Sequence, residues 1–131
     1  MELNLKGRTA LITGASQGIG ACIARTLHLA GANIVINHPN LPNTLADAER
    51  LASELEAARK SSTLVAPANV AEAEQVQAMM ASAKQHFGGI DFLINNTLAN
   101  IRRTLEHRYG PSDNVEDLVK KAQAAYYEDV R

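Results

Sequence analysis

Apolar residues are distributed along this chain in two alternating patterns. Short continuous apolar runs are separated by longer segments in which apolar residues recur every three or four positions. Continuous runs are typical of strands buried on both faces, and the longer period is typical of helices that bury one side. The predicted strands lie within residues 8–14, 33–37, 62–68 and 90–96. The predicted helices are 19–31, 44–60 and 71–87.

Each predicted helix has one apolar face. The residues expected to point inward are Ile19, Ile23, Leu27 and Ala30, then Leu45, Ala48, Ala52 and Leu55, then Val76, Met79, Met80, Ala83 and Phe87. Buried strands that alternate with helices indicate right-handed βαβ units and a parallel sheet. We therefore predict an α/β fold, a Rossmann-like half domain with a four-stranded parallel sheet in the order 3-2-1-4 and helices on both faces.

The pattern changes after residue 96. Residues 97–110 are polar and basic, and from Val115 to Val130 apolar residues recur at helical spacing without a further strand. We expect a single truncated domain, 1–131, in which 1–100 is the nucleotide-binding part and 101–131 is a helical C-terminal cap. The fourth strand would then be an open apolar edge, which favours cover by the cap or self-association into a homo-oligomer.

Composition and charge narrow the choice of partners. The chain is 46% hydrophobic and 21% charged, with a formal net charge of −1. This balance is that of an ordinary soluble domain, and it gives no electrostatic reason to expect nucleic acid or a membrane surface as a partner. One cysteine, no signal-like segment and four scattered histidines lead us to expect a cytoplasmic protein without a metal site.

The segment "TGASQGIG", residues 13–20, joins the first predicted strand to the first helix. A glycine-rich turn at this place lets the backbone approach a pyrophosphate and points a helix N-terminus at it. Gly14 would make the turn, Gly18 would allow close approach, and Gly20 would allow the helix to pack on the strand. The candidate contacts in the loop are Gly14, Ser16, Gln17, Gly18, Ile19 and Gly20. The alternative is a tight turn that binds nothing.

The spacing T-G-x-x-x-G-x-G resembles that of the short-chain dehydrogenase/reductase family, particularly its ketoacyl-reductase-like members. "INN", residues 94–96, is similar to the start of that family's Asn-Asn-Ala-Gly motif. The resemblance covers about residues 1–100 and implies a Rossmann fold that binds NADP or NAD. The further cofactor contacts that it implies are Asn37, His38, Asn69, Val70, Asn95 and Asn96.

The sequence departs from the family pattern at three places. Asn69 stands where the family often has Asp, and Leu98 stands where it has Gly. No acidic residue follows the second strand, which favours NADP, with His38 or Asn40 near the 2′-phosphate. The alternative for His38 is an exposed loop histidine.

The family's catalytic pair is a Tyr with a Lys four residues later. In this chain Tyr126 is followed by Val130 and Tyr127 by Arg131, so no catalytic residue is assigned. The main expectation is a non-catalytic scaffold with at most residual NADP or NAD binding. One alternative is an NADP-dependent short-chain reductase of a carbonyl substrate, completed by another chain. Another is a module that dimerises through its sheet edge.

Residues 108–131 are similar to a barrel helix of family 2 glycoside hydrolases. They contain no paired carboxylates suited to sugar hydrolysis. Two ancestries in one chain would indicate an engineered or recombined chimera.

Overall fold

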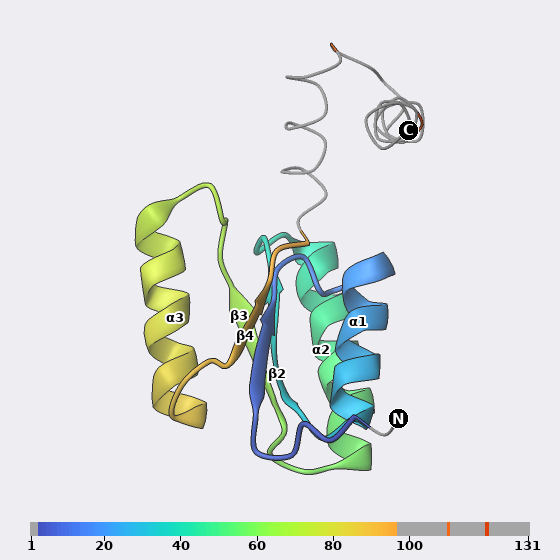
Figure 1. Cartoon of the computed structure of the whole chain (residues 1–131). Helices are drawn as coiled ribbons and strands as arrows, with labels where there is room; N and C mark the ends of the chain where they lie inside the picture. Colours follow the sequence, from blue (N-terminus) through green and yellow to red (C-terminus); the bar gives the residue numbers. More distant parts are fainter. Residues whose placement is uncertain (1–2, 97–109, 111–119, 121–131) are drawn as a thin grey trace, which may run out of the picture. The chain divides into compact units, whose positions relative to one another are not determined.

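A computed structural model describes residues 3–96, Gly110 and Lys120. Strands and helices alternate along residues 3–96, and the sheet is parallel with the order β3-β2-β1-β4, as predicted (Figure 1). The elements are β1 (Thr9–Ile12), α1 (Gly18–Leu29), β2 (Asn33–His38), α2 (Pro42–Ala58), β3 (Thr63–Pro67), α3 (Ala73–Phe87) and β4 (Phe92–Ile94).

The helices cover both faces of the sheet. Helices α1 and α2 lie on one face and α3 lies on the other (Figure 1). Successive strand residues point to opposite faces, so Ile34 and Ile36 pack under α1 and α2 while Val35 packs under α3. Because both faces are covered, the central strands are apolar along their whole length, which explains the continuous runs in the sequence.

The inward face of α2 differs from the prediction at its first turn, while Ala48, Ala52 and Leu55 pack inward as predicted. Leu45 is exposed, whereas Thr44, Ala48, Leu51 and Leu55 are buried. Thr44 is turned inward because its hydroxyl accepts the Leu41 N–H at 3.0 Å and donates to the Leu41 carbonyl at 2.9 Å. These bonds tie Thr44 to Leu41 at the first turn of the helix. The prediction that Leu45 points inward is therefore wrong.

Helix α1 differs from the prediction at both ends: it ends at Leu29, so Ala30 is its cap, and His28 is buried in its last turn. Ile19 is 72% exposed, so it does not belong to the inward face. Ile23 and Leu27 are partly buried and pack against the core, as expected. The core on this side is completed by Ala21 and Ala24, whose small side chains are buried against the sheet.

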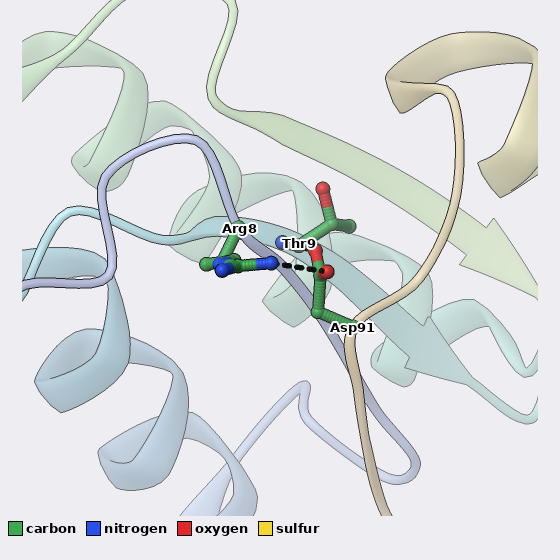
Figure 2. Close-up of polar contacts among 3 residues, drawn as sticks. All are labelled: Arg8, Thr9 and Asp91. Atoms are coloured by element: carbon green, nitrogen blue, oxygen red, sulfur yellow. Dashed lines mark hydrogen bonds and ion pairs between the residues drawn. The ribbon is translucent and has the colours of Figure 1, made fainter.

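A carboxylate fixes the start of β4 beside β1. Asp91 accepts the backbone N–H of Thr9 at 2.8 Å and Nη1 of Arg8 at 3.3 Å, and these side chains lie together in Figure 2. The Asp91 N–H also donates to the Thr9 carbonyl at 2.8 Å. The hydrogen bond from the Thr9 N–H is the main cause that holds the pKa of Asp91 below its ordinary value. Burial acts in the opposite direction, and Arg8 lowers the pKa further.

Strand β4 is an edge strand of the described sheet, and Phe92 and Leu93 are exposed on it. The chain divides into two compact units, Met1–Asn96 and Thr97–Arg131. The predicted cap, its cover of β4 and the tyrosines Tyr126 and Tyr127 fall outside the described residues. Within the described part of the chain, no helix is long and apolar enough to cross a membrane.

Candidate functional site

The carboxyl ends of the four parallel strands meet at one edge of the sheet, which is uppermost in Figure 1. The chain leaves β1 for α1 on one face and reaches β4 from α3 on the other, so the topology switches between β1 and β4. Ligands of open α/β sheets bind at such a switch point. Four segments were predicted to hold the cofactor, and all lie at this edge: residues 37–38 end β2, and residues 13–20, 69–70 and 95–96 follow β1, β3 and β4.

The glycines of the β1–α1 loop are needed for two different geometric reasons. Gly14 and Gly18 have left-handed backbones, with φ of 59° and 60°, a conformation that glycine adopts without cost. A Cβ on Gly20 would collide with the Gly14 carbonyl oxygen and would lie 2.6 Å from Asn96 Nδ2 and 2.9 Å from Ala15 Cα. The turn at Gly14 and the close packing at Gly20 are thus confirmed, while contact with a cofactor stays a prediction.

The N–H groups at the two ends of this loop have different surroundings. Those of Gly14 and Ala15 are bonded to Asn37, at 3.2 and 2.9 Å. The first N–H groups of a helix have no partner within the helix, and α1 begins at Gly18 without a side-chain cap or an acidic residue in its first turn. This end of α1 is therefore suited to bind an anion.

Thr13 joins the ends of β1 and β4, a role that the sequence analysis missed. Its hydroxyl accepts the Asn96 N–H at 2.7 Å and donates to the Ile94 carbonyl at 3.4 Å. The Thr13 N–H also donates to the Ile94 carbonyl, at 3.0 Å. These bonds bring Asn96 against Gly20 in the first turn of α1. The sequence signal for this role is the position of Thr13 directly before Gly14. Its burial is known only from the structure.

His38 is fully buried, so the expectation of an exposed loop histidine is wrong. Strand β2 continues through His38, and the alternation of the strand turns its ring toward α2. Nδ1 accepts the Asn40 N–H at 3.1 Å and lies 3.2 Å from Thr44 Oγ1. Nε2 is buried and has no partner among the described residues.

Burial lowers the pKa of His38, against the opposing charge of Glu49. The ring is neutral near pH 7, and because Nδ1 accepts a hydrogen bond, its proton is on Nε2. A neutral, buried imidazole presents no charge to a 2′-phosphate. The predicted place of His38 beside that phosphate therefore has no support in the structure.

The remaining predicted contacts lie at the surface or in turns. Asn69 is exposed, with its Oδ1 accepting the Ala71 N–H at 3.0 Å and its own N–H donating to Gln75 Oε1 at 2.7 Å. Gln17 and Asn95 are exposed, and Val70 is partly exposed. Ser16 is buried, at 8% exposure. No group of three His, Cys, Asp or Glu side chains in the described part of the chain is arranged to hold a metal ion.

The family model for short chain dehydrogenases matches residues 8–128. The chain belongs to the short-chain dehydrogenase family. An uncharacterized oxidoreductase of Mycobacterium bovis is 33% identical over 93% of the chain and 34% of its own length. The D-beta-hydroxybutyrate dehydrogenase of Rhizobium meliloti is 39% identical over 68% of the chain and 33% of its own length.

A solved short-chain dehydrogenase structure from Pseudomonas syringae has the same fold. It superposes with a TM-score of 0.63 at 29% identity, over 74% of this chain and 38% of that one. The chain thus spans about a third of the length of the relatives it matches. The match with the family extends through most of residues 108–131. The comparisons give no support to a glycoside hydrolase helix or a chimera in this segment.

Proposed function

We propose that this short-chain dehydrogenase chain forms the dinucleotide-binding part of an NAD(P)-dependent oxidoreductase that acts on a carbonyl or hydroxyl group. The observation that carries the proposal is the uncapped N-terminus of α1, held by the glycine loop at the switch point of the sheet. The comparisons support the reductase alternative over a non-catalytic scaffold, because the relatives are oxidoreductases.

The first turn of α1 would hold the cofactor's pyrophosphate. The N–H groups of Gly18, Ile19 and Gly20 lie at the positive end of the helix dipole, and no carboxylate of that turn opposes them. The adenine would lie toward Asn69 and Val70 after β3. When bound, the nicotinamide supplies or accepts the hydride, and it would lie toward Asn95 and Asn96 after β4.

The end of β2 would set the preference between NADP and NAD. Carboxylates at this place bind the ribose 2′-OH of NAD and repel a 2′-phosphate. Here the two residues are Asn37 and His38, both buried and uncharged. We propose that NADPH binds at least as tightly as NADH, because no charge at the end of β2 opposes the phosphate.

Gly18 provides the test of phosphate binding, and Gly88 provides its control. Both glycines have left-handed backbones, and a Cβ on either would meet nothing within 4 Å. Valine at either position adds backbone strain of about 1–2 kcal/mol, but only position 18 lies in the proposed phosphate site. We expect Gly18→Val to weaken NADPH binding at least about tenfold, equivalent to about 1.4 kcal/mol.

The measurement is a titration of NADPH and NADH followed by nicotinamide fluorescence, at a temperature where circular dichroism shows all proteins folded. Gly88→Val should bind like the unsubstituted chain. Equal affinity in Gly18→Val and the unsubstituted chain would exclude this loop as the phosphate site.

A further inference from the structure

The side chain of Asn37 joins three neighbouring strands at the cofactor edge. It is 2% exposed and lies at the end of β2, which is between β1 and β3. Its Oδ1 accepts the Gly14 N–H at 3.2 Å. Its Nδ2 donates to the carbonyls of Ala66 and Ala68 at 3.1 and 3.2 Å. The backbone carbonyl of Asn37 accepts the Ala15 N–H at 2.9 Å.

The chemistry of this position requires an amide. The side chain must offer an acceptor to the N–H of Gly14 and a donor to the carbonyls of Ala66 and Ala68. An amide carries both in one plane, whereas an ionised carboxylate has only acceptors. An ionised Asp at position 37 would place its negative charge against two carbonyl oxygens. A leucine would leave a buried N–H and two carbonyls without these partners, each at a cost.

The contacts of Asn37 lead to the first turn of α1. Asn37 holds the N–H groups of Gly14 and Ala15 toward β2, so neither is available to an anion. The Gly14 carbonyl and Ala15 Cα are in turn the backbone atoms against which Gly20 packs. The place where the helix begins is thus fixed by backbone that Asn37 holds.

We infer that Asn37 is a positioning residue for the phosphate site rather than a cofactor contact. Its amide fixes the start of the β1–α1 loop, and the loop fixes the N-terminus of α1 that receives the phosphates. This inference rests on the proposed dinucleotide binding. It replaces the prediction that the Asn37 side chain touches the cofactor, because that side chain is buried and bonded to backbone groups on both sides.

The most informative variant is Asn37→Asp, because protonation restores one of the two donors that the ionised form lacks. A neutral carboxylic acid has one O–H donor and one carbonyl acceptor, so it restores one of the amide's two donors together with its acceptor. Burial beside two carbonyls raises the pKa of such an acid. NAD⁺ is the probe, and the ratio of its Kd for Asn37→Asp to its Kd for the unsubstituted chain is measured at pH 8 and pH 5.5. We expect a ratio of at least about ten at pH 8 and a clearly smaller ratio at pH 5.5.

Two further variants separate positioning from a loss of stability. Ser62→Ala removes a buried hydrogen bond between Ser62 Oγ and His28 Nε2, which are 2.7 Å apart. Ser62 directly precedes β3, so it lies at the amino ends of the strands, away from the proposed phosphate site. This substitution should lower the melting temperature and leave the Kd unchanged. Asn37→Thr introduces one uncharged hydroxyl in place of the amide and should fold even where Asn37→Asp does not. We expect Asn37→Thr to bind NAD⁺ more weakly than the unsubstituted chain.

The outcomes distinguish this inference from the proposed function. A folded Asn37→Asp that binds like the unsubstituted chain at pH 8 overturns the inference, as does an Asn37→Thr of unchanged affinity if Asn37→Asp does not fold. Failure of the unsubstituted chain to bind NAD⁺ and NADP⁺ overturns the proposed function instead. In that case amide hydrogen exchange decides the loop contact. Gly14 should exchange faster in the Asn37 variants while Val35 is unchanged, and an unchanged Gly14 rate contradicts the inference.

Discussion

Alanine at position 20 should lower the free energy of unfolding by about 2–4 kcal/mol, the upper range for overpacked sites. The added Cβ would collide with the Gly14 carbonyl oxygen and lie 2.9 Å from Ala15 Cα. Both are backbone atoms at the junction of β1 and α1, and they cannot rotate away as a side chain can. Relief therefore requires α1 to move away from the sheet, which opens the core beneath it.

Gly89→Ala is the matched control. A Cβ at position 89 meets nothing within 4 Å, and the residue does not have a left-handed backbone. Its substitution should change the free energy of unfolding by less than about 0.5 kcal/mol. Urea denaturation followed by circular dichroism measures both variants. If Gly20→Ala and Gly89→Ala unfold at the same urea concentration, the close contact at Gly20 does not limit stability.

Acidification below pH 6.5 should destabilise the protein through two buried histidines. Burial is the main cause that lowers the pKa of both His28 and His38. The charge of Arg59 lowers the pKa of His28 further, while the charge of Glu56 raises it. A lowered pKa means that the unfolded chain takes up protons that the folded chain does not. The contribution of the two neutral histidines to the free energy of unfolding is therefore fully present above pH 6.5. It is lost as the pH falls from there toward the folded-state pKa values.

The slope of the free energy of unfolding against pH has an upper limit that can be calculated. One histidine that is charged only in the unfolded chain contributes up to about 1.4 kcal/mol per pH unit, so two contribute up to about 2.7. Asp91 acts in a separate window. Because its pKa is lowered, its contribution is present above the ordinary pKa of aspartate, about 3.9, and is lost below it.

Urea midpoints measured between pH 8 and pH 5 test this prediction. His28→Gln and His38→Gln should each be less stable than the unsubstituted chain at pH 8, since each loses a buried hydrogen bond, to Ser62 and to the Asn40 N–H respectively. Each variant should nevertheless show about half of the original pH slope. A midpoint that stays constant over this range would contradict the assignment of neutral, buried rings.

The sequence alone predicted the fold, which the structure confirms, and a candidate cofactor site. Strands buried on both faces must be apolar at every position, and helices covering them must be apolar on one side, so these two periods specify a parallel α/β sheet. The position of the glycine loop between the first strand and helix then predicted a phosphate site at the carboxyl ends of the strands. The close packing at Gly20 followed from the same local pattern, because a strand–turn–helix of this length leaves no room for a side chain there.

Only the tertiary structure decided how individual polar residues act. Asn37 bonds to Gly14 and Ala66, and Thr13 to Ile94 and Asn96, partners up to 83 residues away that no local pattern identifies. His38 is buried because β2 is one residue longer than the predicted strand, 33–37. In the first turn of α2, Thr44 is buried and bonded to Leu41, and its neighbour Leu45 is exposed. Periodicity determines which faces are buried, whereas the roles of the polar groups depend on which strand ends the fold brings together.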